Sequence, residues 1–241
     1  MHKLLLTATA LVLFASSPAL ADEKKGVWAI EPDPALPNVL ILGDSISIGY
    51  TLQVRKALEG KANVFRPHTA DGTKAENCSG TTKGVEAIDR WLGDRKWDVI
   101  HFNWGLHDLK HVTEPGGNKV SKAASDPVQA TVEQYAQNLE QIVAKLKATD
   151  AKLIFATTTP VPAGTSGVLR EPEAPPKYNA AAVKIMQANG IEVDDLFAFC
   201  QPRLAELQRP KNVHFTDKGS QELANQVSAA IEKALHEKSA K

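Results

Sequence analysis

Short runs of hydrophobic residues alternate along the chain with longer stretches in which hydrophobic residues recur every three or four positions. The short runs predict buried strands at residues 38–43, 63–66, 97–103, 152–157 and 191–194. The longer stretches predict amphipathic helices at residues 46–59, 83–92, 128–148, 177–188 and 217–235. Regular alternation of strands and helices is typical of a parallel sheet with helices on both faces. The pattern therefore predicts an α/β fold, a three-layer α/β/α sandwich around a five-stranded parallel sheet.

Two connections between these elements are unusually long. They cover residues 104–127 and 158–176, and both are rich in Pro and Gly. Long loops in compact domains are often functional. In the flavodoxin-like strand order 2-1-3-4-5, which we expect here, ligands bind at the carboxyl ends of the strands, where these loops begin.

The first 25 residues, MHKLLLTATALVLFASSPALADEKK, have a different character. A lysine is followed by a hydrophobic segment, residues 4–15, and by Ala19-Leu20-Ala21, a small-residue cleavage site. This is the pattern of a secretory signal peptide, residues 1–21, and it predicts a secreted or periplasmic protein cleaved near Ala21. The hydrophobic segment is too short to span a bilayer, so we expect no stable membrane insertion. Residues 22–37 then form a polar, Pro-rich arm, and residues 38–241 a single domain.

Charge and cysteine content narrow the function classes. The chain has 28 Lys and Arg against 28 Asp and Glu, interleaved along the sequence, which gives no reason to expect a nucleic acid as partner. Two cysteines, Cys78 and Cys200, are too few for a disulfide scaffold in a domain of this size. Export allows a disulfide between them, but we expect two separate buried thiols.

Two residues could perform nucleophilic catalysis. Ser45 directly follows the first predicted strand and begins a helix, where unpaired backbone N–H groups can stabilise an anion. The alternative is that Ser45 only caps the helix, which is the usual function of serine there. His214 lies before the last helix, where the chain can return to the first strand and supply a base. The chain has no G-x-S-x-G motif, so a nucleophile elbow is not indicated.

Four short motifs carry a resemblance to a known family. Gly43-Asp44-Ser45 resembles the first block of the GDSL, or SGNH, hydrolases. The second, third and fifth blocks of that family are matched by CSGTT (78–82), NWGLHDLKH (103–111) and NVHFTDKG (212–219). TTTPVP (157–162) and YNAAA (178–182) are similar to passages of carbohydrate-esterase members. The resemblance spans residues 38–235 and implies the SGNH hydrolase fold.

The resemblance also implies residue functions. Ser45 is the nucleophile, His214 is the base, and the N–H groups of Ser45 and Gly80 form the oxyanion hole. In the third block the family has Asn as a further oxyanion donor, whereas this chain has His107, which we expect to donate as a neutral imidazole.

In the fifth block the family has Asp three residues before the histidine, whereas this chain has Lys211. We therefore expect a Ser–His dyad whose ring is oriented by a backbone or amide oxygen, as Asn212 could provide. Asp194 or Asp195, at the end of the fifth strand, could replace the missing acid. Asp44 is expected to order the nucleophile turn, and Asp108 or a loop carbonyl to hold the His107 tautomer.

Other residues are weaker candidates. Trp104 could stack on a sugar ring or pack in the core, and Arg170 could contact a polar substrate or be solvated. His107 and His111 are spaced four apart, as helical metal ligands often are, but no carboxylates or third histidine accompany them, so we expect no metal. We expect no cofactor either, because a serine and a histidine suffice for nucleophilic catalysis.

Together these observations predict a secreted serine esterase that hydrolyses short-chain esters, with acetyl groups on a carbohydrate as the expected substrate, through an acyl-enzyme. The expected partner is a small-molecule or saccharide ester. One alternative is a lysophospholipase or thioesterase of the same family, which needs a hydrophobic acyl groove that these polar loops do not suggest. The other is a non-catalytic carbohydrate-binding relative, in which the two changed blocks mark lost chemistry.

Overall fold

The computed structural model describes residues 26–239 and has the predicted three-layer architecture. Its sheet contains five parallel strands in the order β2-β1-β3-β4-β5. The strand bounds are β1 (Asn38–Leu42), β2 (Asn63–Phe65), β3 (Val99–Phe102), β4 (Lys152–Ala156) and β5 (Glu192–Asp194). The predicted fold class and strand order are therefore confirmed. The predicted signal peptide lies outside the described residues.

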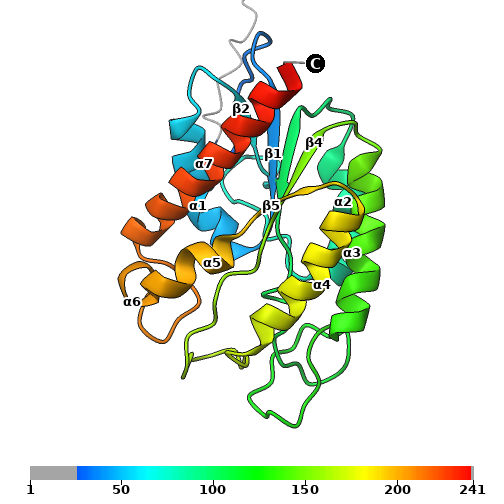
Figure 1. Ribbon diagram of the computed structural model, residues 1–241, viewed down its shortest axis with the longest axis vertical. Helices are drawn as coiled ribbons and strands as arrows, with labels where there is room; N and C mark the ends of the chain where they lie inside the picture. Colours follow the sequence, from blue (N-terminus) through cyan, green and yellow to red (C-terminus); the bar gives the residue numbers. More distant parts are fainter. Residues whose placement is uncertain (1–25, 240–241) are drawn as a thin grey trace, which may run out of the picture.

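Helices cover both faces of the sheet (Figure 1). One face carries α1 (Ser45–Ala57) and α7 (Asp217–Ser239), and the other carries α2 (Thr81–Leu92), α3 (Val132–Lys147) and α4 (Ala174–Ala188). Between β5 and α7 the chain forms three short elements, α5 (Leu196–Cys200), η1 (Gln201–Arg203) and α6 (Leu204–Leu207). Both faces of the central strands are consequently buried, as their continuous hydrophobic runs require.

The two helix starts that differ most from the sequence prediction are those of α3 and α4. α3 begins at Val132 rather than residue 128, because Thr131 caps it by accepting a hydrogen bond from the Gln134 N–H. α4 begins three residues earlier than predicted, at Ala174, and includes Pro175 in its first turn. Proline is tolerated there because the first N–H groups of a helix have no partner within it.

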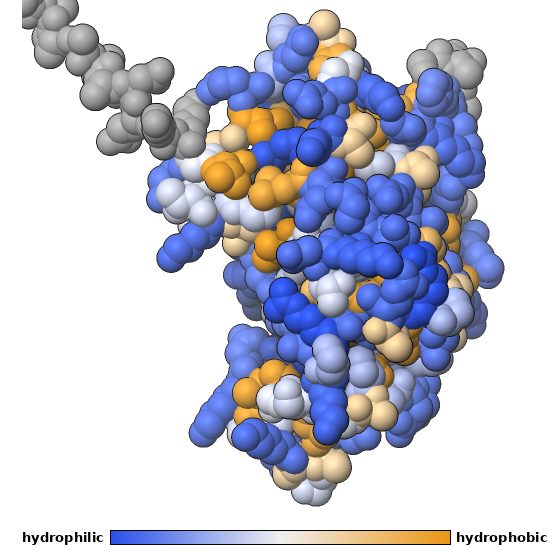
Figure 2. Space-filling model, turned by 90° about the vertical axis from the view of Figure 1, so that its left-hand side faces the viewer, coloured by the Kyte–Doolittle hydropathy of each residue, from blue (hydrophilic) through white to orange (hydrophobic). Residues whose placement is uncertain are grey.

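The two long loops lie together beyond the carboxyl ends of the strands, at the lower end of the molecule in Figure 1. His111 joins them, because its backbone N–H donates to Leu169 O at 3.0 Å. Its Nδ1 lies 2.7 Å from Asp126 O, a contact within the first loop. Figure 2 shows a mostly hydrophilic face, indented between the main body and this lower end. Among residues 26–239, no helix combines the length and hydropathy that crossing a bilayer requires.

Candidate active site

The turn from β1 into α1 presents Ser45, whose hydroxyl is not used to cap the helix. Asp44, which is buried, is the helix cap, and its carboxylate accepts a hydrogen bond from the Ile46 N–H at 2.8 Å. Ser45 therefore does not cap the helix, and Asp44 orders the turn as expected. The Ser45 Oγ lies 2.9 Å from Nε2 of His214, across 169 residues of sequence.

The backbone itself determines the orientation of His214. Asn212 Oδ1 lies 2.9 Å from the His214 backbone N–H and 2.8 Å from the His214 Nδ1. A backbone N–H can only donate, so the amide atom facing it is the oxygen, and that oxygen then accepts from Nδ1–H as well. The ring proton is on Nδ1, and Nε2 turns its lone pair to the Ser45 hydroxyl. Asn212 thus takes the place in which the family pattern has Asp.

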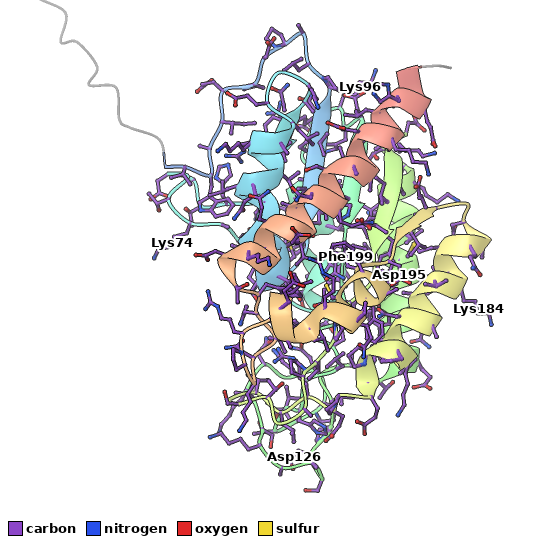
Figure 3. The ribbon with its side chains drawn as sticks, turned by 60° about the vertical axis from the view of Figure 1, so that its left-hand side comes forward. Lys74, Lys96, Asp126, Lys184, Asp195 and Phe199 are labelled. Carbon is purple, nitrogen blue, oxygen red and sulfur yellow. The ribbon has the colours of Figure 1, made fainter. Side chains whose placement is uncertain are left out.

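Neither candidate acid near β5 reaches the His214 ring. Asp194 is buried beside His101 Nε2, 3.2 Å away, and accepts a hydrogen bond from Gln226 at 2.9 Å. Asp195 caps α5 and accepts from the Thr157 hydroxyl at 2.8 Å. Figure 3 shows Asp195 at the start of that helix. The idea that either replaces the missing acid is wrong, because both carboxylates are held by other groups.

The loop between β2 and α2 brings Gly80 to the nucleophile turn. The Cys78 N–H donates to Gly43 O at 3.1 Å, which joins the two segments. Neither Ser45 N–H nor Gly80 N–H has a hydrogen-bond partner among residues 26–239, so both can donate to an oxyanion. A side chain at position 80 would require Gln129 to shift, because its Cβ would lie 2.9 Å from Gln129 Oε1.

Asp108 supports this loop and does not hold the His107 tautomer. Its Oδ1 accepts from the Thr81 backbone N–H at 2.8 Å and from the Thr81 hydroxyl, which fixes the start of α2 behind Gly80. Its Oδ2 is buried without a partner. Burial raises the pKa of Asp108 to about 7. The carboxyl group is therefore partly protonated at neutral pH.

His107 lies beside the same loop. Its Nδ1 faces the Ser79 hydroxyl at 3.2 Å and the Lys110 Nζ at 3.4 Å. Burial lowers the pKa of His107 to about 4; the cations of Lys110 and Arg170 act in the same direction, while Asp44 opposes them. The imidazole is consequently neutral above about pH 5, one unit above that pKa, as its expected function requires.

Replacing His107 tests its function as the third oxyanion donor. His107→Ala is expected to lower kcat on a small acetyl ester by about 10²–10³, the cost of losing one such donor. His107→Asn should recover much of that activity, because the amide also donates. Steady-state kinetics of both variants provide the measurement. An alanine variant as active as the parent would place His107 outside the oxyanion hole.

Arg66, which sequence analysis did not single out, lies directly behind the nucleophile. It is buried, and its guanidinium donates to Gly43 O at 2.7 Å, Glu76 O at 3.1 Å and Ser47 Oγ at 2.8 Å. It therefore connects the turn before Ser45 to the loop that leads to Gly80. The available signal was a cationic residue directly after a buried strand at the carboxyl edge of the sheet.

The two candidate substrate contacts differ. Trp104 is fully buried, with 0% of its surface exposed, and its indole N–H donates to Cys78 O, so of the two alternatives the structure shows core packing. Arg170 is half-buried, and its Nε donates to Leu106 O at 2.7 Å, which places it next to the His107 turn. Cys78 and Cys200 are both buried and unbonded.

The pH profile should respond to residue 212. Burial lowers the pKa of His214, Arg170 and Arg209 lower it further, and Asp44 opposes them. A general base must be neutral to accept a proton. We therefore expect kcat/KM to fall on the acid side of its pH profile, with the midpoint of this acid limb below about pH 6.5. In Asn212→Asp a carboxylate faces Nδ1 and favours the imidazolium, so the limb should move to higher pH. An unmoved limb would show that residue 212 does not contact the ring during turnover.

Comparisons with known proteins agree with this geometry. A model of the GDSL-like lipase/acylhydrolase family matches residues 41–222, more than half of the chain. No curated protein matches the sequence. Several solved structures have a similar fold. The acetyl xylan esterase AlAXEase has a TM-score of 0.62 at 15% identity, with 80% of this chain and 99% of that chain covered.

A lipase/acylhydrolase from Enterococcus faecalis has a TM-score of 0.64 at 17% identity, over 82% of this chain and 96% of that one. LAE5, an alpha/beta hydrolase enzyme from the metagenome of Lake Arreo, Spain, has a TM-score of 0.61 at 16% identity, with 80% of this chain and 94% of that chain covered. At these identities the structural likeness supports the fold alone, whereas the family model covers all the motifs of the site. The chain therefore belongs to the GDSL-like lipase/acylhydrolase family and is a carboxylic ester hydrolase.

Proposed function

We propose that this protein hydrolyses short-chain esters, chiefly acetyl groups on a carbohydrate, with Ser45 as nucleophile and His214 as base. The observation that carries the proposal is the chain of contacts from Ser45 Oγ through the His214 ring to Asn212 Oδ1. A free serine hydroxyl is a weak nucleophile, and a neutral imidazole within hydrogen-bond distance activates it.

The reaction follows from this geometry. As Ser45 Oγ bonds to the ester carbonyl carbon, its proton moves to His214 Nε2. The carbonyl oxygen becomes an anion, which the N–H groups of Ser45 and Gly80 and the His107 ring stabilise. When the tetrahedral intermediate collapses, the alcohol leaves with the proton from Nε2. A water molecule, deprotonated by His214, then releases the acid and regenerates Ser45.

Two features support a short acyl group and a polar alcohol. The short acyl group is supported by the similarity of residues 157–162 and 178–182 to passages of carbohydrate-esterase members. The polar alcohol is supported by Arg170, which places a cationic group near the histidines and suits a saccharide better than a lipid tail.

The non-catalytic alternative is weaker. It depends on the loss of two supporting groups of the family pattern. Asn212 and His107 occupy the corresponding places beside His214 and Gly80 and can supply the same hydrogen bonds. A binding protein would have no need of a serine hydroxyl paired with an imidazole lone pair.

An ester panel tests the proposal. Acetylated saccharides are compared with p-nitrophenyl esters of two to sixteen acyl carbons, with Ser45→Ala as the blank. We expect the highest kcat/KM for acetyl esters and a steep fall with chain length. A maximum at long chains would favour a lysophospholipase or thioesterase, and equal rates with the blank would favour a binding protein.

We also propose that the protein is exported, with the mature chain starting at Asp22. The support is the sequence of residues 1–21, which has a basic start, a hydrophobic segment and small residues at the cleavage site. The mass of the protein recovered outside the cytoplasm should lack those residues. A full-length chain retained in the membrane fraction would contradict export.

A further inference from the structure

The two histidines of the site face different partners at Nδ1. At His214 the partner is the oxygen of Asn212, so Nδ1 carries the proton and Nε2 is the acceptor. At His107 the partners are the Lys110 Nζ at 3.4 Å and the Ser79 Oγ at 3.2 Å. A ring nitrogen that faces an ammonium group is in the opposite situation to one that faces a carbonyl oxygen.

The lysine decides the tautomer of His107. An ammonium group has three donors and no acceptor, so Nδ1 must offer it a lone pair. The Ser79 hydroxyl both donates and accepts, so it is compatible with either tautomer. In the neutral ring the proton is then on Nε2, which has no partner among residues 26–239 and can donate to an oxyanion.

Lys110 is costly where it lies. It is 6% exposed, and its Nζ forms no ion pair among residues 26–239. Asp108 is nearby in sequence, but the carboxylate oxygen of Asp108 that makes hydrogen bonds is occupied by Thr81. Burial lowers the pKa of Lys110, Arg170 lowers it further, and the charge of Asp108, which makes no ion pair with it, opposes them. A buried cation without a carboxylate partner costs stability, so its retention calls for a functional reason.

We infer that Lys110, assisted by Ser79, is a positioning residue that holds His107 in its Nε2–H tautomer, so that the ring donates to the oxyanion while His214 is held in the opposite tautomer as base. The inference rests on the proposed function, because the oxyanion is that of the ester attacked by Ser45. Lys110 itself does not contact the substrate.

A double-mutant cycle tests this function. Lys110→Met removes the donor and keeps the length of the side chain. It should lower kcat between about tenfold and the 10²–10³ of a lost donor, with KM little changed, because the bond forms in the transition state. In a His107→Asn background the same change should cost less than about twofold, since an amide has no ring tautomer to hold.

Lys184→Met is the matched control: this exposed lysine of α4 points away from the body of the molecule in Figure 3, and activity should be unchanged. An equal loss in both backgrounds would mean that Lys110 only supports the loop, and no loss in either would mean that it has no function in turnover. Both results would overturn the inference. If Lys110→Met does not fold, Lys110→Gln replaces it. The glutamine amide can turn either its oxygen or its NH₂ group to Nδ1, so it holds neither tautomer, and the same pattern of losses is expected.

The tautomer can also be read without activity. ¹⁵N NMR of histidine-labelled Ser45→Ala protein distinguishes protonated from unprotonated ring nitrogens, and His107→Asn assigns the signal. We expect Nε2–H for His107 with Lys110 present and a mixture or the other tautomer with methionine. Nδ1–H with Lys110 present would overturn the inference. If the ester panel failed while this signal was observed, the proposed function would be wrong and the tautomer assignment would stand.

Discussion

Ser45→Ala should abolish ester hydrolysis while leaving the fold intact. We expect kcat to fall by about 10⁴–10⁶, as in other serine hydrolases that lose the nucleophile. The fold should persist because Asp44, not Ser45, caps α1. The cost to unfolding free energy should stay below about 1 kcal/mol, less than the loss of a helix cap. The measurements are turnover of an activated acetyl ester and a thermal melt.

Asp44→Ala is the contrasting variant. It removes the cap and leaves the nucleophile, so it should lower the unfolding free energy by about 0.5–2 kcal/mol. If Ser45→Ala kept more than a few per cent of wild-type turnover, the acyl-enzyme mechanism would be untenable.

The largest effect on stability is expected from Arg66→Met. The guanidinium donates to the carbonyl oxygens of Gly43 and Glu76 and to the hydroxyl of Ser47, and methionine donates to none of them. Losing these three charge-assisted hydrogen bonds should lower the unfolding free energy by about 2–5 kcal/mol. Because the turn before Ser45 loses its support, kcat should fall as well. Urea unfolding followed by circular dichroism measures the first effect.

Arg95→Met provides the control. Arg95 is exposed and lies over the Phe65 ring, with its guanidinium carbon 4.2 Å from the ring centre. Its removal should cost no more than about 1 kcal/mol, the usual size of an exposed cation–π contact. Equal effects of the two substitutions would mean that the hydrogen bonds of Arg66 contribute no more than a surface contact.

The fold was predictable from the sequence because the positions that are hydrophobic in the sequence are those that the sheet and its covering helices bury. The errors lie where local chemistry competes with periodicity. The helix predicted from residue 177 begins at Ala174, because proline fits the first turn of α4. The helices α5 and α6 are too short to show a period in the sequence.

The site was predictable at Ser45, Gly80 and His214 as far as the motifs place residues at one edge of the sheet. What joins those residues was not. Arg66 acts through hydrogen bonds to two other segments, at Gly43 and Glu76. Lys110 acts through the direction of its side chain, which points to His107. One sequence reveals neither. Trp104 shows the converse, since its residue type suggests sugar binding but its position beneath Cys78 places it in the core.

The sequence distance between Ser45 and His214 has a consequence for the nascent protein. The nucleophile is made early in synthesis, and the base follows 169 residues later, directly before α7, which packs beside α1. Contacts of such long range form late, after the intervening chain has been ordered. A partly synthesised or still unfolded chain therefore has a serine without a base, and the catalytic pair is complete only once the segment before the last helix has reached the first strand.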